Sequence, residues 1–166
     1  MILVTGATGT IGGPLVTRLA ADNVPARAIA RRPGQGGLPP NVEFIAADLS
    51  RLDAIRPALR DVTALFIHSR AVGAAAPALL RLAAAHGVER VVVLSAINVD
   101  DDPARQPTRA NGDRNKEVEG AFVNSGLPWV SVRAGSFAFN ISTVWAAQIR
   151  PVRRSCVASM PTSPKH

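Results

Sequence analysis

The chain of 166 residues contains no tyrosine and a single cysteine. Without tyrosine, every mechanism in which a phenol passes a proton to a substrate is excluded. Cys156 cannot form a disulfide within the chain, and its isolation suits a reducing compartment. The apolar stretches end well short of the ~20 residues that a membrane helix needs, and no basic segment precedes an apolar one at the start of the chain. These absences predict a cytoplasmic protein that has no membrane partner.

Acidic residues are outnumbered, with 12 Asp and Glu against 19 Lys and Arg, which gives a net charge of +7. More than half of this excess lies in residues 150–166, which hold four basic residues and no acidic one. Aromatic side chains do not alternate with these arginines, as they would in a surface that stacks on nucleic-acid bases. We therefore expect residues 150–166 to form an irregular basic tail, and we expect no nucleic-acid partner.

The most informative segment is residues 1–14, MILVTGATGTIGGP, an apolar run followed by regularly spaced glycines. The run at residues 2–5 is typical of a parallel strand that is buried on both faces. Glycines at such spacing permit a tight turn, let the backbone approach a pyrophosphate and let a helix pack closely on a strand. The first N–H groups of the following helix would then bind an anion. The segment predicts a dinucleotide site formed by Gly6, Thr8, Gly9, Thr10, Ile11 and Gly12.

Apolar runs alternate with helical patterns along the chain, which indicates βαβ units and a parallel sheet. We expect one α/β domain over residues 1–149, a Rossmann-type doubly wound parallel sheet with helices on both faces and strand order 3-2-1-4-5-6. Ser50 is expected to cap a helix that Pro57 kinks or shortens. The expected strands are 2–5, 26–30, 42–46, 64–67, 90–94 and 129–133, and the other expected helices are 13–21, 75–85, 112–124 and 142–149.

Two segments resemble a known family. Residues 5–12, TGATGTIG, are similar to the Gly-x-x-Gly-x-x-Gly turn of the extended and atypical short-chain dehydrogenase/reductase superfamily. Residues 124–140, NSGLPWVSVRAGSFAFN, resemble the SGLPWTxLRPxxFxxN stretch of its NmrA-like, NAD(P)H-binding branch. The resemblance runs from Met1 to about Gln148. NmrA-like proteins normally continue into further strands and helices that wall the substrate site, so we expect that lobe to be largely missing here.

Two arginines, Arg31 and Arg32, follow the second expected strand. Dinucleotide folds commonly place an acidic residue near this point to hold the adenosine ribose. A guanidinium offers forked donors for a phosphate, whereas a carboxylate would repel the 2′-phosphate. We therefore expect NADP(H) to be favoured over NAD(H). The alternative is that both arginines are solvated loop residues.

Three polar residues follow or end the next two strands. The resemblance implies that Asp48 lies beside the adenine, and the alternative is an aspartate that serves a turn. His68 and Ser69 end the fourth strand at the carboxyl edge of the sheet, where ligands bind in such folds. They are predicted to approach the ribose or the nicotinamide, unless they are merely polar residues at a strand end. The histidines and Cys156 show no metal-ligand spacing, so no metal site is expected.

The catalytic residues stay unknown at this stage, because the Tyr-x-x-x-Lys pair of many short-chain reductases is absent. Ser95, directly after the fifth expected strand, matches the superfamily's serine, and Lys116 lies on the helix that would supply the lysine. The family pattern puts Asn115 at that position, and one residue is ~100° of rotation on a helix. Ser95 and Lys116 are therefore weak candidates. Phe137 and Asn140 match the family's Phe and Asn, which implies a place on the nicotinamide side.

Two classes of function remain open. The resemblance implies an NADP(H)-dependent oxidoreductase that acts by hydride transfer on a small carbonyl or quinone. The missing tyrosine and substrate lobe instead favour a regulatory module that senses NADP(H) without turnover, or a truncated product that retains only cofactor binding. The substrate and the oligomeric state are not readable from the sequence.

Overall fold

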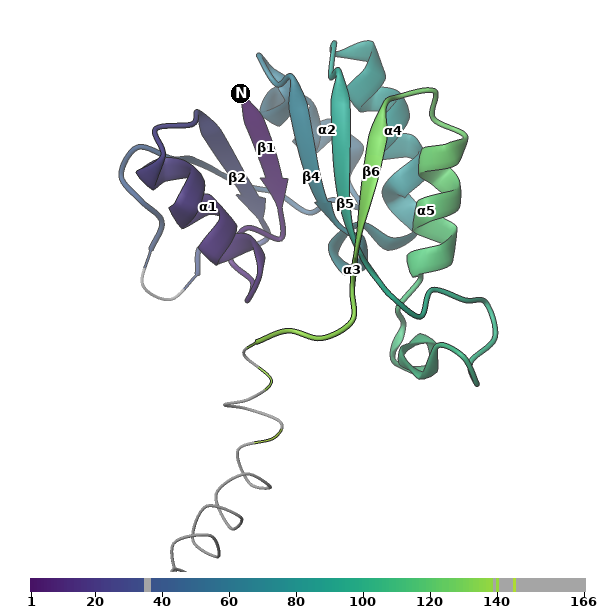
Figure 1. The fold of residues 1–166 in the computed structure, drawn as a ribbon. Helices are drawn as coiled ribbons and strands as arrows, with labels where there is room; N and C mark the ends of the chain where they lie inside the picture. The colour runs from purple at the N-terminus through teal and green to yellow at the C-terminus, as the bar shows by residue number, and fades with distance from the viewer. Residues whose placement is uncertain (35–36, 139, 141–144, 146–166) are drawn as a thin grey trace, which may run out of the picture. The chain divides into compact units, whose positions relative to one another are not determined.

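The computed structural model describes residues 1–34, 37–138, 140 and 145. The chain divides into one compact unit at Met1–Ala134 and a second that begins at Gly135 (Figure 1). The domain boundary expected at residue 149, the helix expected at 142–149 and the basic tail all lie outside the described residues. None of the described helices has the length and apolarity that crossing a bilayer requires.

Six parallel strands form the sheet of the first unit, in the predicted order β3-β2-β1-β4-β5-β6. The order reverses between β1 and β4, since the chain moves outward from β1 to β3 and then returns to place β4 on the other side of β1. Val4 of β1, for example, lies between Ala28 of β2 and Phe66 of β4. Such a reversal is the switch point at which open α/β sheets bind ligands. The strands are β1 (Ile2–Thr5), β2 (Ala26–Ala30), β3 (Glu43–Ala46), β4 (Ala64–His68), β5 (Arg90–Ala96) and β6 (Trp129–Ala134).

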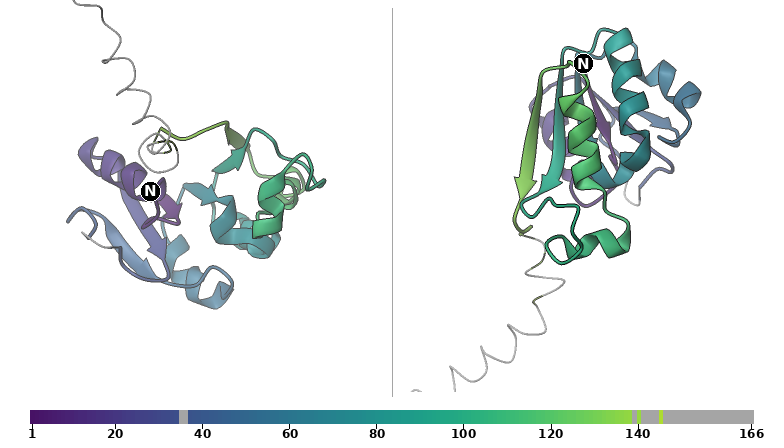
Figure 2. Two further views of the ribbon diagram at one scale, coloured as in Figure 1. Left: turned by 90° about the horizontal axis from the view of Figure 1, so that it is seen from below. Right: turned by 90° about the vertical axis from the view of Figure 1, so that its right-hand side faces the viewer.

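Helices cover both faces of the sheet, as expected. Helix α1 packs on one face of β1 and β2, and α2, η1, α3, α4 and α5 pack on the other face (Figure 2). Leu3 and Val4 are both fully buried because successive side chains of β1 enter the two different apolar layers. The helical segments are α1 (Gly12–Ala21), α2 (Leu52–Ile55), η1 (Arg56–Leu59), α3 (Ser69–Val72), η2 (Gly73–Ala75), α4 (Ala76–Ala85), η3 (Pro107–Asn111) and α5 (Asn115–Val123).

The structure corrects two local predictions. Ser50 does not cap α2, because its N–H and its hydroxyl both bond to Asp48 Oδ1 at 2.9 Å; Arg51 holds the cap position without a side-chain bond. Ser95 lies inside β5 and not after it, since β5 extends two residues further by pairing with β6. Pro57 has the predicted effect, because α2 ends at Ile55 and the chain continues as the 3₁₀ helix η1.

A buried arginine on β2 forms hydrogen bonds to β3 and to the segment around η1. Arg27 of β2 donates from Nε to Glu43 Oε2 on β3 at 2.8 Å. Its Nη1 donates to the carbonyl oxygens of Ala58 and Arg60 at 2.7 Å. Because a buried charge is tolerated only when it is paired and hydrogen-bonded, this guanidinium fixes where η1 runs relative to β2 and β3.

Strand β6 presents two different faces. Trp129 packs near Phe122 of α5, with ring centroids 5.8 Å apart, and Glu119 of α5 bonds to Ser131 and Arg133. Val130 and Val132 point the other way and are 60% and 47% exposed. The sheet is therefore covered by α5 on one face of β6 and left open to solvent on the other.

Candidate functional site

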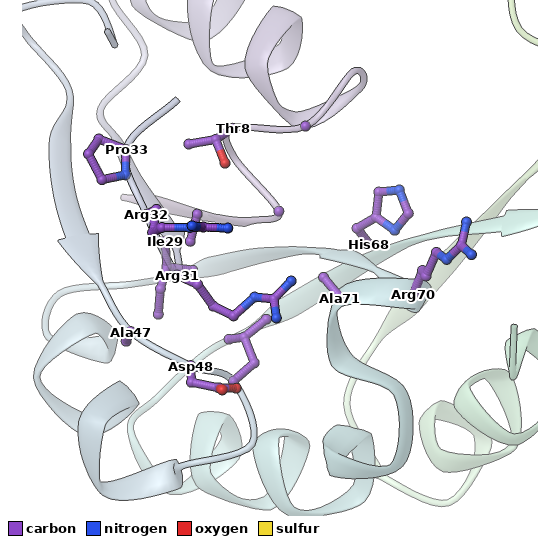
Figure 3. A pocket seen from close by; sticks show the side chains of 14 residues that line it. Thr8, Ile29, Arg31, Arg32, Pro33, Ala47, Asp48, His68, Arg70 and Ala71 are labelled. Atoms are coloured by element: carbon purple, nitrogen blue, oxygen red, sulfur yellow. The ribbon is translucent and has the colours of Figure 1, made fainter. Parts of the chain in front are cut away.

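A pocket of about 670 Å³ opens at the carboxyl ends of four strands (Figure 3). This volume lies within the range typical of small-molecule and cofactor sites. The lining residues come from the loop after β1, the loops after β2 and β3, and the junction of β4 with α3. They are Gly6, Thr8, Gly9, Ile29, Ala30, Arg31, Arg32, Pro33, Ala47, Asp48, Leu49, His68, Arg70 and Ala71.

Each of the three glycines after β1 is placed differently, so a side chain would have a different effect at each position. Gly6 has a φ of +63°, a backbone conformation that side chains disfavour. A Cβ on Gly12 would lie 2.2 Å from the carbonyl oxygen of Gly6, so no side chain fits between α1 and β1. A Cβ on Gly9 would lie 3.2 Å from the same oxygen, which is tight but less severe. Gly6 and Gly9 line the pocket, whereas Gly12 is buried behind it.

The start of α1 is suited to an anion. The residue at its cap position, Ile11, makes no side-chain hydrogen bond to the helix, and the first turn holds no acidic residue. The first N–H groups of a helix have no partner within the helix, and they carry its positive dipole end. In α1 the N–H of Gly13 already donates to the carbonyl oxygen of Gly9 at 2.9 Å and Pro14 has no N–H, so the N–H of Gly12 and the helix dipole are what this terminus offers to a pyrophosphate. Thr8, Gly9 and Thr10 are exposed in the loop that leads to this helix, although Thr10, Ile11 and Gly12 do not line the pocket itself.

Arg31, Arg32 and Asp48 lie together on the side of the pocket formed by β2 and β3 (Figure 3). Both arginines are exposed, and neither forms an ion pair closer than 4 Å within the described part of the chain. Hydrogen bonds from Ser50 lower the pKa of Asp48, and Arg31 contributes to the same shift. Asp48 is therefore ionised at neutral pH. A Cβ on Gly34 would lie 3.2 Å from Thr8 Cβ, so the loop after the arginines runs directly against the glycine loop.

The pair at the end of β4 is separated by the structure. His68 lines the pocket, but Ser69 is buried and donates its hydroxyl proton to Asn115 Oδ1 at 2.5 Å. The bond joins α3 to the first residue of α5. Ser69 therefore supports the wall of the pocket from behind and does not line it.

Arg70 is a lining residue that the sequence reasoning missed. It follows Ser69 in α3, its Nε lies 3.3 Å from Asp113 Oδ1, and its Nη2 donates to the carbonyl oxygen of Asn111 at 3.3 Å. Its position two residues after a strand end at the carboxyl edge was an available signal, because that edge is where such folds bind ligands.

The two weak catalytic candidates lie away from the lining of the pocket. Lys116 is half exposed, and its Nζ forms an ion pair with Asp101 at 2.6 Å. Ser95 is buried beside Glu119 of α5. Asn115, and not Lys116, is the residue of this helix turn that points inward. The two candidates therefore do not come together as a catalytic pair.

The carboxylate of Glu119 is held in its charged form. Burial raises its pKa, but hydrogen bonds from Arg133 and Ser131 outweigh that effect and lower it. Arg133 Nε lies 3.1 Å from Glu119 Oε1, and Ser131 Oγ lies 2.7 Å from the same oxygen. These bonds hold α5 against β6, so the charge of Glu119 is explained by its structural role.

Phe137 and Asn140 belong to the second unit and are described by themselves. Asn140 Nδ2 donates to Ser136 Oγ at 3.2 Å, and the N–H of Asn140 donates to the carbonyl oxygen of Phe137 at 2.9 Å. Their predicted place on the nicotinamide side stays a prediction.

Residues 6–151 match a family described as NAD(P)H-binding. A curated (4-alkanoyl-5-oxo-2,5-dihydrofuran-3-yl)methyl phosphate reductase from Streptomyces griseus is 38% identical over 165 residues, covering 90% of this chain and 52% of the relative. An NAD(P)H azoreductase from Xenophilus azovorans is 30% identical over 155 residues, covering 90% of this chain and 52% of the relative. The chain thus spans about half the length of these curated relatives.

Solved structures agree in fold. The NADPH-dependent quinone oxidoreductase from Escherichia coli, in complex with NADPH, superposes with a TM-score of 0.68 at 24% identity, covering 91% of this chain and 55% of the other. The triphenylmethane reductase from a Citrobacter species, in complex with NADP(H), gives a TM-score of 0.67 at 19% identity with the same coverages. At these identities the likeness establishes the Rossmann-type fold.

Proposed function

The chain belongs to the NAD(P)H-binding family, and from this premise we propose that it is an NADP(H)-dependent oxidoreductase acting by hydride transfer on a small carbonyl or quinone. One observation carries the proposal: the glycine loop, the two arginines, Asp48 and His68 all line a single pocket at the switch point of the sheet. Ligands bind at such points because the loops after adjacent strands diverge there.

Each part of the pocket fits a part of the dinucleotide. The glycine loop and the start of α1 would hold the pyrophosphate, because glycines let the backbone come close to it and the positive end of the α1 dipole attracts an anion. Asp48 and the neighbouring end of β3 would face the adenosine. The junction of β4 with α3, which carries His68 and Arg70, would then face the nicotinamide end.

Preference for NADP(H) is proposed from Arg31 and Arg32. Two exposed guanidinium groups stand at the end of β2, and β2 itself ends without a carboxylate. Arginine binds phosphate through parallel N–H donors, and the 2′-phosphate is the group that distinguishes NADPH from NADH. Asp48 is the one acidic side chain among the lining residues, and it lies on the neighbouring strand.

The relatives point to electron-poor acceptors as the substrate class. Their names describe reduction of an unsaturated lactone phosphate and of azo compounds, and the structural neighbour reduces quinones. When bound, the reduced nicotinamide would supply the hydride, and the protein would orient it and limit access of water. The single cysteine in the chain suits a reducing, cytoplasmic setting for such a protein.

A second candidate function is a module that senses NADP(H) without turnover. The observation that favours it is the state of the α5 lysine: Lys116 is paired with Asp101 and does not line the pocket, and no tyrosine exists to work with it. Under this alternative the pocket binds the dinucleotide, and the bound state is read by another molecule.

Calorimetric titration of the purified chain with NADPH and with NADH tests the proposal. We expect both to bind, with NADPH binding more tightly. NADPH oxidation in the presence of 1,4-benzoquinone then separates the two candidate functions, because the oxidoreductase consumes NADPH and the sensing module does not. Failure of both dinucleotides to bind would contradict both candidates.

A further inference from the structure

His68 is the side chain of the pocket that can exchange a proton near neutral pH. The other ionisable lining residues are Arg31, Arg32, Arg70 and Asp48. Arginine stays protonated at any physiological pH, and hydrogen bonds from Ser50 keep Asp48 ionised. An imidazole is the group whose ordinary pKa lies in the working range. Reduction of a carbonyl needs one proton as well as one hydride, so a reductase built on this pocket must have a source for that proton.

The position of His68 is fixed on both sides. Its backbone N–H donates to Thr5 Oγ1 at 2.9 Å, which ties the end of β4 to the end of β1. The next residue, Ser69, bonds to Asn115, and Arg70 pairs with Asp113. A Cβ on Gly6 would lie 3.4 Å from His68 Cβ, so the histidine stands directly against the glycine loop. The backbone of His68 is therefore held at the switch point, beside the glycine loop.

The ring of His68 is partly buried, and the groups around it set its charge state. His68 Nδ1 is buried and has no hydrogen-bond partner among the residues that the structure describes. Burial outweighs the other contributions and lowers the pKa of His68 below its ordinary value, while Asp113 raises it and Arg70 lowers it further. Asp113 precedes α5 and Arg70 lies on α3, so one negative and one positive group both act on the charge of the ring. The phosphates of a bound dinucleotide would add negative charge to the same pocket and raise the pKa of His68.

We propose that His68 is the proton donor of this pocket, in place of the tyrosine that the chain lacks. The assignment rests on the oxidoreductase function proposed above. As the substrate carbon accepts a hydride, the C=O π electrons move to oxygen. A new O–H bond forms with the proton of the His68 imidazolium, the N–H bond breaks, and its electron pair stays on nitrogen. The neutral imidazole regains a proton from water, so one hydride and one proton convert the carbonyl to an alcohol.

Titration of the histidines by NMR tests the assignment without turnover. We expect the imidazole signals of His68 to titrate at a higher pH when NADP⁺ is present, whereas those of His86 do not move. His86 is the matched control, because it lies at the end of α4, where Nδ1 contacts the carbonyl oxygen of Leu82 at 2.8 Å. The His68→Gln and His86→Gln variants assign the signals. An unchanged His68 titration with saturating NADP⁺ would show that the ring does not face the cofactor and would overturn the proposal.

Kinetics with NADPH and 4-nitrobenzaldehyde complete the test. We expect His68→Gln to keep its affinity for NADPH within a few-fold and to lose about 100-fold or more in kcat. Wild-type kcat should fall as the pH rises through the pKa of His68, because the donor must be protonated, and the variant should lack this dependence. Imidazole added to His68→Ala should restore part of the rate.

The outcomes separate the two proposals. A wild-type protein that binds NADPH but reduces neither the aldehyde nor 1,4-benzoquinone contradicts the oxidoreductase function, and the proton donor with it. Normal turnover by His68→Gln contradicts the proton donor alone. If that variant fails to fold by circular dichroism, His68→Asn is measured in its place under the same criteria.

Discussion

At the carboxyl edge of the sheet, β1, β2 and β3 are followed by the glycine loop, two arginines and an aspartate, whereas β4 ends in His68 and β5 carries the buried Ser95 before its last residue. The first half offers groups that fit a dinucleotide, and most of them line the pocket. The second half lacks the tyrosine of related reductases, and its lysine is engaged with Asp101 at the surface. Under the proposed function, binding and chemistry would therefore rest on different halves of the fold.

The largest expected effect comes from Gly12. A Cβ there would meet the carbonyl oxygen of Gly6 at 2.2 Å, and backbone atoms cannot move aside cheaply. We expect Gly12→Val to destabilise the protein by about 3 kcal/mol or more, measured by urea unfolding. Gly9→Val should instead abolish NADPH binding while most of the secondary structure persists by circular dichroism, because Gly9 lines the pocket. Equal behaviour of the two variants would contradict this division between fold and binding.

The next effect concerns the arginines after β2. Replacing Arg31 and Arg32 together by Ala should weaken NADPH binding by about 1.5–3 kcal/mol, the range for hydrogen bonds to charged groups, and leave NADH binding nearly unchanged. Calorimetry with both dinucleotides measures the difference. The double variant Arg56→Ala and Arg60→Ala, outside the pocket lining, controls for the loss of two positive charges. If wild-type protein binds NADH and NADPH equally, the arginines do not select the cofactor.

A smaller effect is expected from Glu119. It lies in the second half of the fold, where it holds α5 to β6 and does not line the pocket. Glu119→Gln should lower stability by about 1–2 kcal/mol, because Arg133 and Ser131 lose a charged acceptor. Since folding lowers the pKa of Glu119, its contribution is fully present above the ordinary value of 4.5 and is lost as the pH falls through the lowered value. Thermal unfolding as a function of pH should show the variant and the wild type converging in acid. A constant difference at all pH values would contradict the assigned charge state.

The smallest effect is expected from Lys116. Its pair with Asp101 is exposed on both sides, and exposed pairs contribute about 0–1 kcal/mol. Lys116→Ala should leave both NADPH affinity and any turnover nearly intact in steady-state assays. A collapse of kcat in this variant would mean that the lysine leaves Asp101 and reaches the reacting atoms.

The sequence predicted the sheet order because buried parallel strands appear as short apolar runs separated by helical patterns. The glycine turn was readable for a similar reason, since the local backbone alone dictates its residues. The Ser50 cap was wrong because α2 begins one residue later than a Ser50 cap requires, and Ser50 instead donates to Asp48 in a local turn. The end of β5 and the start of α5 depend on pairing with β6 and on the Ser69–Asn115 bond, both contacts between distant residues. The inward place of Asn115 could not be read without those contacts, whereas the position of Arg70 just after a strand end was a signal that could have been used.

Arg27 has a consequence for how the molecule opens. One guanidinium bonds to β3 and to both Ala58 and Arg60, so these segments cannot separate from β2 one at a time without exposing an unpaired buried charge. Local unfolding proceeds in cooperative units whose boundaries follow such shared contacts. The wall of the pocket that carries Arg31 and Asp48 should therefore open and close as a single unit, and a bound dinucleotide would stabilise all of that unit at once.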